Sequence, residues 1–301
     1  MKMKCVKCDR KAVAELPYAS KTYCRKHFLE HYETRVRREI SKYKMMNKKE
    51  KIAVGVSGGK DSMALLFLLH KLGYNIKAIL IDEGAKEYRG KMIPFVKKLC
   101  KRLGVPLHVF TFKKEYGKTL DEIMKTKRFA CSYCGVLRRT LLNKAARSIR
   151  ADKLVIGHNM DDEAQTIMMN MFRSELVRLA RSGPVVGVVS DKKFVKKVKP
   201  LRQCSEKENV IYCLLNGIEY TEAKCPYAHE ALRNSVRNAL NALEEEHPGV
   251  KVGIVHSFDR MLPFLREYFV KKDVGKPNRC PECGELTSGR VCKACEMLGA
   301  V

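Results

Sequence analysis

The 301-residue sequence contains no tryptophan, no long apolar run and few acidic residues for its many basic ones. Without tryptophan, stacking on a nucleobase would fall to tyrosine, phenylalanine, histidine or arginine. No apolar stretch reaches the roughly 20 residues that a membrane-spanning helix needs, and the N-terminus has no apolar signal-peptide segment. We therefore expect a cytoplasmic protein that does not associate with a membrane.

The shortage of acidic residues produces a large positive charge. Asp and Glu number 33 against 60 Lys and Arg, which gives a net charge of +27. Such an excess favours a polyanionic partner, because phosphates release counterions when they meet basic side chains. The basic residues recur along the chain, as at 35–38 and 138–139, rather than in one tail. This spread predicts a broad nucleic-acid-binding surface, with general solubility charge as the alternative.

The clearest motif is Ser57-Gly-Gly-Lys-Asp-Ser62, between the apolar run 52–56 and an apolar helical pattern. Two glycines let the backbone approach a ligand, and the first turn of a helix offers N–H groups to an anion. The spacing differs from that of a Walker A loop, which places four residues between its first Gly and Gly-Lys. The motif therefore predicts a different kind of phosphate site, with a glycine-rich turn without a ligand as the alternative. Its expected ligand-binding residues are Val56, Ser57, Gly58, Gly59, Lys60, Asp61 and Ser62.

Strand-like runs alternate with helical patterns through residues 51–217, which predicts an α/β fold with a doubly wound parallel sheet. Ligands of such sheets bind at the carboxyl ends of the strands. We expect an interruption at 131–135 before a helix at 137–147, and helical structure over 225–269, broken at 247–249. The other expected strands are 76–82, 107–112, 153–157 and 195–201, and the other main helices are 30–46, 91–103, 161–182 and 205–216.

Two further segments should lie at the carboxyl edge of this sheet. Gly157, directly after the fourth strand, would give a nucleotide access to the backbone. Asp161 and Asp162 occupy the first turn of the next helix, where negative charge is stabilised. Carboxylates beside a phosphate suggest a bridging Mg²⁺, with simple helix capping as the alternative. Arg202 follows the fifth strand and could reach a phosphate.

Thirteen cysteines in a cytosolic chain indicate metal or redox chemistry rather than disulfides. Each end of the chain carries two short knuckles that together supply four soft ligands, the set that a structural tetrahedral Zn²⁺ requires. Free thiols or an iron site are the alternatives, and His31 is a weaker candidate ligand than His27. The ligands expected for two Zn²⁺ are Cys5, Cys8, Cys24 and His27, then Cys280, Cys283, Cys292 and Cys295.

Three more cysteines, Cys131, Cys134 and Cys225, lie outside both zinc motifs. Three thiols without a fourth protein ligand suit a 4Fe–4S cluster with one iron open to a substrate. A persulfide-carrying cysteine with a resolving partner is another interpretation, and structural cysteines are a third. The spacing alone does not separate these.

The motifs together carry a family resemblance. Ser57-Gly-Gly-Lys-Asp-Ser62 matches the PP-loop of the N-type ATP pyrophosphatases, in which adenylation releases pyrophosphate. With Cys131-Ser-Tyr-Cys134-Gly-Val-Leu-Arg138-Arg139, Gly157-His-Asn-Met-Asp-Asp162, Cys225-Pro and two terminal zinc ribbons, the chain resembles the TtcA/TtuA family of tRNA thiolation enzymes. Cys134-Gly-Val-Leu-Arg-Arg139 and Met169-Asn-Met-Phe-Arg173 resemble the enzymes of the wobble uridine more than those of the T-loop uridine.

This resemblance implies an ATP-dependent tRNA 2-thiouridine synthetase that works as a homodimer. Carbon 2 of a uridine is activated by adenylation, and sulfur replaces its oxygen through a 4Fe–4S cluster held by Cys131, Cys134 and Cys225. Adenine would rest at Ile81, and Arg138, Asp161 or Asp162 would assist at the phosphate or the Mg²⁺. The sulfur donor would be a ubiquitin-like thiocarboxylate protein, a persulfide carrier or sulfide. The alternatives are a cysteine-persulfide PP-loop enzyme, an amidating synthetase and a nucleic-acid-binding module without chemistry.

The expected organisation has four parts. A zinc ribbon and a basic helix occupy residues 1–46, and the PP-loop ATP-binding domain occupies 47–220. A helical segment carrying the third cluster cysteine follows at 221–275. A second zinc ribbon closes the chain at 276–301.

Overall fold

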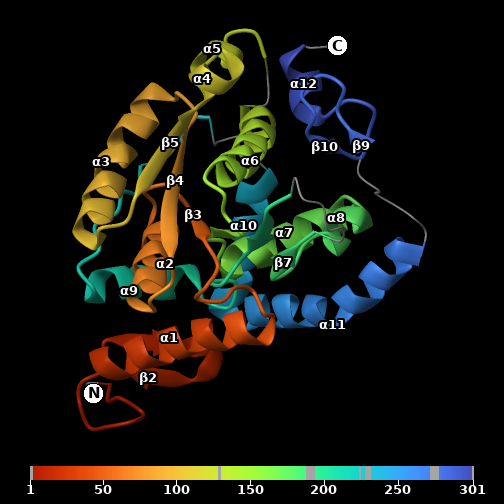
Figure 1. The fold of residues 1–301 in the computed structure, drawn as a ribbon. Helices are drawn as coiled ribbons and strands as arrows, with labels where there is room; N and C mark the ends of the chain where they lie inside the picture. Colours follow the sequence, from red (N-terminus) through yellow and green to blue (C-terminus); the bar gives the residue numbers. More distant parts are fainter. Residues whose placement is uncertain are drawn as a thin grey trace.

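The centre of the molecule is a six-stranded sheet (Figure 1). The structure is a computed structural model, and it describes residues 3–127, 130–187, 194–223, 225–227, 232–271 and 278–299. The strand order is β5-β4-β3-β6-β8-β7, and all neighbouring strands are parallel except β7 and β8. The predicted α/β fold is confirmed, with an antiparallel edge strand that the sequence pattern did not predict. The strands are β3 Ile52–Val56, β4 Ile76–Asp82, β5 Leu107–Thr111, β6 Lys153–Ile156, β7 Val185–Val186 and β8 Lys196–Val198.

Helices cover both faces of the sheet because successive strand residues point to opposite sides. In β3, Ile52, Val54 and Val56 join a core with helices α2, α3 and α9, whereas Ala53 joins a core with α6 on the other face. A third core unites α7, α8, α10 and α11. The helices are α1 Arg25–Lys42, α2 Lys60–Lys71, α3 Lys86–Leu103, α4 Phe112–Tyr116, α5 Leu120–Met124, α6 Ala130–Ser148, α7 Met160–Phe172, α8 Leu176–Ala180, α9 Glu206–Leu215, α10 Leu232–Glu246, α11 Val250–Lys271 and α12 Lys293–Leu298.

The strand order places a switch point between β3 and β6. From β3 the chain proceeds outward to β4 and β5, and it then returns to β6 on the other side of β3. The strand order therefore reverses between β3 and β6, and this is where open parallel sheets have a crevice at their carboxyl edge. The loops that follow β3 and β6 begin with Ser57 and Gly157, so the two predicted motifs meet at one place.

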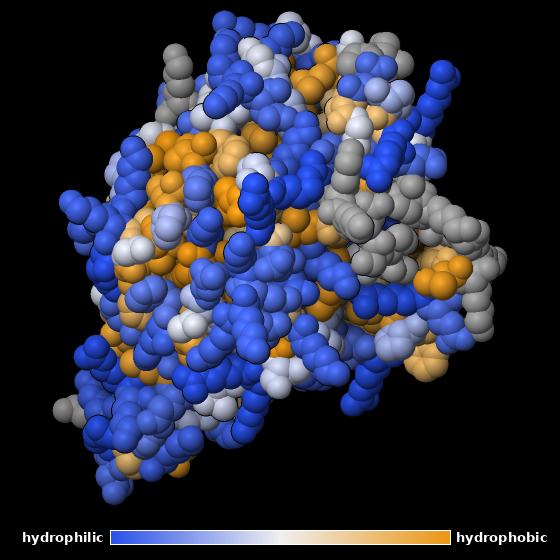
Figure 2. Space-filling view, viewed as in Figure 1, coloured by the Kyte–Doolittle hydropathy of each residue, from blue (hydrophilic) through white to orange (hydrophobic). Residues whose placement is uncertain are grey.

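A small two-stranded unit lies at each end of the chain. The N-terminal unit pairs β1 Ala14–Leu16 with β2 Lys21–Tyr23, and the C-terminal unit pairs β9 Asn278–Arg279 with β10 Leu286–Thr287. The N-terminal unit contacts α9, since Tyr18 Oη donates to Glu208 Oε1 at 3.1 Å. The C-terminal unit packs on α6, where Arg147 pairs with Glu285. Figure 2 shows that hydrophilic side chains cover most of the viewed face, including the N-terminal unit at the lower left.

Several element boundaries differ from those predicted. Helix α1 begins at Arg25 rather than residue 30, because Cys24 takes an extended N-cap conformation. Residues 131–135 do not interrupt a helix but form the beginning of α6. The helix expected over 161–182 is two helices, separated near Ser174, whose φ of 54° is left-handed. The expected domain boundary at residues 275 and 276 lies outside the described residues. No described helix combines the length and the apolar character that crossing a membrane requires.

Candidate active site and metal centres

The loop after β3 is closed on itself by its two serines. Ser57 donates its N–H to Ser62 Oγ at 3.0 Å, and Ser62 Oγ donates to the carbonyl of Gly59 at 3.0 Å. Gly58 has a φ of 90°, and a Cβ there would lie 2.9 Å from the Met92 carbonyl oxygen. Only glycine fits this position. The loop is thus fixed in shape, with Gly59 as the N-cap of α2.

The second loop packs directly against the first. A Cβ on Gly157 would lie 3.0 Å from the Ser62 nitrogen and 3.1 Å from the Asp61 carbonyl carbon. The structure therefore gives Gly157 a packing role, because a side chain would separate β6 from the first turn of α2. Asn159 continues this contact by donating its side-chain N–H to Asp61 Oδ1 at 3.0 Å.

The two charged residues of the phosphate loop have different surroundings. Asp61 Oδ1 also accepts from Asn209 Nδ2 at 2.7 Å, and burial raises the pKa of its carboxyl group. Lys60 Nζ lies 2.6 Å from Glu206 Oε1 and 3.4 Å from Asp61 Oδ2. Burial works against its charge, but these two carboxylates outweigh burial and raise the pKa of Lys60. The ammonium is therefore charged, and a phosphate would compete with Glu206 for it.

Asp161 and Asp162, predicted to assist at the Mg²⁺, are both engaged within the protein. Asp161 is buried, with Oδ1 2.5 Å from Lys251 Nζ and Oδ2 accepting from the Glu206 N–H at 2.7 Å. Asp162 caps α7 through the Asn159 N–H, and burial raises the pKa of its carboxyl group. Asp161 therefore does not fit a direct ligand of Mg²⁺, since both its oxygens already have partners.

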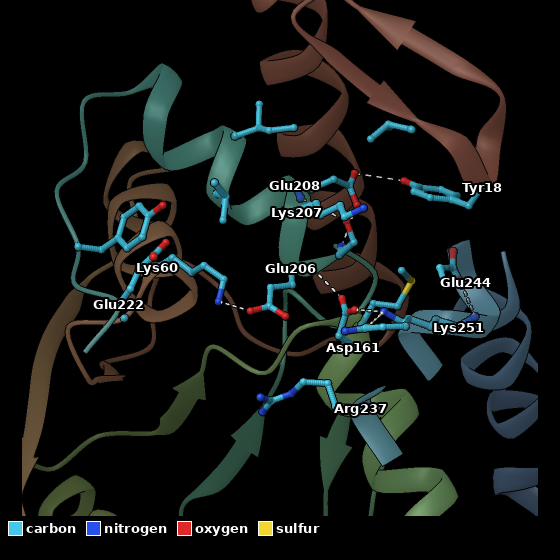
Figure 3. A pocket seen from close by; sticks show the side chains of 18 of the residues that line it. Tyr18, Lys60, Asp161, Glu206, Lys207, Glu208, Glu222, Arg237, Glu244 and Lys251 are labelled. Atoms are coloured by element: carbon cyan, nitrogen blue, oxygen red, sulfur yellow. Dashed lines mark hydrogen bonds and ion pairs between the residues drawn. The ribbon is translucent and has the colours of Figure 1, made fainter. Parts of the chain in front are cut away.

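A cavity of about 1060 Å³ opens beside the phosphate loop. Figure 3 shows Glu206 between Lys60 and Asp161, with Arg237 and Lys251 approaching from α10 and α11. The N-terminal unit forms a further wall through Tyr18. Despite the high positive charge of the chain, carboxylates are prominent in the lining: Glu15, Asp161, Glu206, Glu208, Glu222, Glu244 and Glu245.

A buried ion pair connects the phosphate loop to the strand that carries Ile81. Glu83, just beyond β4, pairs with Arg89 of α3, and Arg89 Nη1 donates to the Ser57 carbonyl at 3.1 Å. Arg138 of α6 reaches the same Glu83, with Nη1 3.5 Å from Oε1. Ile81 itself is buried in the core between the sheet and α6.

Arg202 does not reach the phosphate site. Its side chain is fully buried, and its guanidinium pairs with Asp259 of α11 at 2.6 Å and with Glu39 of α1 at 3.2 Å. The prediction that it reaches phosphate was wrong. A buried arginine needs carboxylate partners, and α1 and α11 provide them.

The three cysteines predicted to hold a cluster, Cys131, Cys134 and Cys225, lie around the beginning of α6. Cys131 donates its S–H to the Tyr227 carbonyl at 3.4 Å, which places α6 next to the segment that contains Cys225. Burial raises the pKa of Cys134 to about 11, and the Cys225 thiol and Glu83 act in the same direction. All three thiols are free, and Cys131 is exposed. An iron–sulfur cluster is held by cysteine thiolates, and no disulfide consumes these three sulfurs.

The two terminal units each bring four metal-ligand atoms within 4.8 Å of one another. In the first, His27 Nδ1 lies 3.3 Å from Cys5 Sγ and 3.6 Å from Cys24 Sγ. His31 instead stacks on Tyr23, and burial lowers the pKa of its imidazole to about 4. The two groups match the prediction: Cys5, Cys8, Cys24 and His27, and Cys280, Cys283, Cys292 and Cys295. Both fit zinc ribbons.

Backbone geometry favours the metal-binding form of one thiol in the second group. Burial opposes ionisation of Cys280, but hydrogen bonds from the backbone near Cys292, Cys283 and Glu282 lower its pKa to about 6. The thiolate is the form that binds a metal. This effect is confined to Cys280, because burial raises the pKa of Cys283 and Cys295 in the same group.

Sequence reasoning missed Glu206 and Lys251, which border the phosphate loop. One signal was present, because Ser205 and Glu208 form a capping box that marks the N-terminus of α9. Since that helix follows β8, its first residue had to lie near the carboxyl edge of the sheet. No sequence pattern pointed to Lys251, because α11 reaches the site only through tertiary packing against α7.

A glycine-rich phosphate loop at the switch point of a parallel sheet defines an ATP-binding α/β protein of the PP-loop class. A family model for the PP-loop domain matches residues 31–244, and one for the N-terminal LIM domain of the 2-thiouridine synthetase TtuA matches residues 4–29. A tRNA-5-methyluridine(54) 2-sulfurtransferase of Pyrococcus horikoshii is 38% identical over 297 residues, which cover 99% of this chain and 94% of the relative.

Two further comparisons agree. A cytoplasmic tRNA 2-thiolation protein 1 of Saccharomyces cerevisiae is 35% identical over 301 residues, with 96% of this chain and 84% of the relative covered. The solved structure of a U34-tRNA thiolase, NcsA of Methanococcus maripaludis with its [4Fe–4S] cluster, superimposes with a TM-score of 0.85 at 31% identity. That match covers 100% of this chain and 97% of the other. The chain belongs to the PP-loop family of tRNA 2-thiolation proteins.

Proposed function

We propose that this protein is an ATP-dependent tRNA-uridine 2-sulfurtransferase. The observation that carries the proposal is the physical link between its two chemical centres. Arg89 donates to the carbonyl of Ser57 in the phosphate loop and pairs with Glu83. Arg138, which lies on the same helix as Cys131 and Cys134, reaches this Glu83 with Nη1 3.5 Å from Oε1. Adenylation and sulfur delivery would therefore take place in one site.

The phosphate loop would hold the ATP phosphates on its backbone and on the two serines. Lys60 would offset their charge and would stabilise the pyrophosphate as it leaves. Arg138 is exposed beside Glu83 and is positioned to meet charge on the α-phosphate. Since both oxygens of Asp161 already have partners within the protein, Mg²⁺ would be held mainly by the nucleotide phosphates and water.

Cys131, Cys134 and Cys225 fit a 4Fe–4S cluster as its protein ligands. They are free thiols near the first turn of α6, and the solved structure of NcsA of Methanococcus maripaludis contains such a cluster. When bound, a cluster with three protein ligands supplies an iron coordination position at which sulfur can be held. A pair of cysteines carrying a persulfide remains the alternative, and the experiment below separates the two.

The wobble uridine is the substrate nucleoside that we propose. The U34 thiolase supports it through a structural match over the whole chain. The T-loop uridine is the second candidate, because the Pyrococcus relative is named for position 54 and the TtuA model matches the N-terminal ribbon.

The remaining parts of the proposal concern the protein's partners. The sulfur donor would be a ubiquitin-like thiocarboxylate protein, a persulfide carrier or sulfide, and the enzyme would act as a homodimer in the cytoplasm. The name of the yeast relative supports the location. The high positive charge supports tRNA as the polyanionic partner.

The test combines two measurements on the purified protein. With ATP, tRNA and sulfide under anaerobic conditions, the cluster-reconstituted protein should release pyrophosphate only when tRNA is present and should form 2-thiouridine. Nucleoside mapping of that tRNA then distinguishes position 34 from position 54. Pyrophosphate release without tRNA would indicate a small-molecule synthetase instead. Equal 2-thiouridine formation by iron-free protein would favour the persulfide alternative.

A further inference from the structure

A second cavity lies between α6, β8 and the C-terminal ribbon, away from the phosphate loop. Its volume is about 410 Å³, and four basic residues contribute to its lining: Arg139, Arg181, Lys197 and Lys293. Glu285 is the acidic residue of this lining, and its carboxylate is already paired with Arg147. Among the described residues of its lining, the cavity therefore has an uncompensated positive charge.

Three of these cations have no acidic partner in the part of the chain that the structure describes. Arg139, Arg181 and Lys197 form no ion pair and no side-chain hydrogen bond there, and Lys197 contacts the Phe194 ring at 5.7 Å. By contrast, Lys293 pairs with Glu296 at 2.5 Å. Arg139 is exposed and Arg181 and Lys197 are half-buried, so water screens part of their mutual repulsion and a bound anion would offset the rest.

The ionisation of two of these groups reflects the repulsion. Burial and the charges of Arg139 and Lys199 lower the pKa of Lys197 to about 8. Desolvation and the charges of Arg138 and Arg178 lower the pKa of Arg139. A bound anion would reverse both effects, because opposite charge favours the cationic form.

The location of the cavity next to the cysteine centre indicates a function for it. Arg139 and Cys134 lie five residues apart on α6, and a Cβ on Gly135 would lie 3.1 Å from Arg139 Nη1, so its guanidinium covers the turn that contains Cys134. Arg139 thus extends between the cysteine centre and the cavity. The wall opposite α6 is the C-terminal ribbon, which contributes Thr287 and Ser288.

We propose that this cavity binds a backbone phosphate of the substrate tRNA and thereby fixes the RNA next to the cysteine centre. The inference rests on the proposed function, because it takes tRNA as the polyanion. Arg139 would present its planar fork to two phosphate oxygens, and Lys197 would add a point charge from β8. The ribbon would be the lid of a phosphate site as well as a zinc-binding module.

The test uses the double variant Arg139→Gln/Lys197→Gln and a control with the same change in net charge. The control, Lys98→Gln/Lys113→Gln, removes two exposed lysines that pair with Glu219 and Glu122. We expect the cavity variant to bind tRNA about tenfold more weakly or worse, with ATP affinity unchanged and a melting temperature that is equal or slightly higher, because the variant relieves the repulsion. The dependence of log affinity on log salt should lose about one unit of slope, as for one lost phosphate contact.

A second measurement uses Lys197 in the unmutated protein. Its low pKa makes the amine reactive near pH 8, so an acylating reagent should label it, and saturating tRNA should protect it. Protection by millimolar inorganic phosphate but not by tRNA would assign the cavity to a free anion and overturn the proposal. Equal labelling with and without tRNA would also overturn it, as would equal tRNA binding by the cavity variant and the control.

Failure of the proposed function has a different signature. It would leave the unmutated protein without tRNA-dependent 2-thiouridine, whatever the variants do. Arg139→Lys separates the two contributions of that residue: it keeps the charge and the salt dependence but loses the fork, so tRNA affinity should fall by less than in the glutamine variant.

Discussion

Lys60, the lysine of the phosphate loop, is paired with Glu206 at the first position of α9, at 2.6 Å. The contact joins the N-termini of two helices that both face the crevice of the sheet. ATP would have to compete with this carboxylate for the ammonium.

Glu206→Gln should strengthen the binding of ATP measured without Mg²⁺ by a few fold, because it removes a negative charge beside the phosphates and releases Lys60. Isothermal titration with ATP and EDTA measures this. Glu245→Gln, which changes an exposed carboxylate of the same cavity, is the matched control. Weaker binding in the Glu206 variant, seen only with Mg²⁺, would instead identify Glu206 as a metal ligand.

Asp161→Asn should lower the free energy of unfolding by about 3 kcal/mol, because it leaves the buried Lys251 ammonium without its carboxylate. Urea unfolding measures the change. The double variant Asp161→Asn/Lys251→Met should recover part of the loss, since no unpaired charge then remains.

This pair of variants separates a structural role of Asp161 from a catalytic one. If the double variant regains both stability and thiolation activity, the residue acts by holding α11 against α7. A variant that is as stable as the unmutated protein but makes no 2-thiouridine would contradict the structural role and support direct catalysis.

Sequence reasoning worked where a motif is contiguous and its chemistry is local. The strand before the phosphate loop and the strand at 76–82 were predicted with their observed ends, because buried parallel strands are unbroken apolar runs. The zinc ligands were found for a similar reason, since each knuckle places its two ligands three positions apart.

The errors arose where distant segments decide the outcome. Arg202 resembles a phosphate ligand in sequence, but Glu39 and Asp259, 163 and 57 positions away, enclose it in the core. The cysteines at 131 and 134 were placed in a break because a Cys-Ser-Tyr-Cys-Gly run is a poor helix former. Packing of α6 on the sheet overrides that local preference.

Cys8→Ser and Cys283→Ser should each remove one of two bound zinc ions per chain and lower the stability of the corresponding ribbon. ATP binding should persist in both, because the phosphate loop belongs to the central sheet. Elemental analysis and thermal unfolding measure the effects. Ser20→Ala, in the tight turn between the first two strands, is a control that leaves the ligands intact. One zinc or none in the unmutated protein would contradict the assignment.

Three single variants, Cys131→Ala, Cys134→Ala and Cys225→Ala, test the cluster. Each should abolish the visible charge-transfer absorbance of the reconstituted protein, because a cluster with three protein ligands cannot lose one and remain stable. Adenylation of tRNA, followed as pyrophosphate release, should survive, since Lys60 and the loop serines lie on separate elements. Cys100→Ala is the matched control, a buried cysteine on α3 remote from all three groups.

The three variants also distinguish the cluster from a persulfide. A persulfide mechanism requires one sulfur-carrying and one resolving cysteine, so one of the three alanine variants would keep full 2-thiouridine formation. A cluster needs each of the three cysteines as a ligand, so all three variants should be inactive. Exposure to air should have the same effect as the substitutions, because the open iron position is accessible to oxidants, and it should leave ATP and tRNA binding unchanged. Retained thiolation after complete loss of iron would rule the cluster out as the sulfur-transfer group.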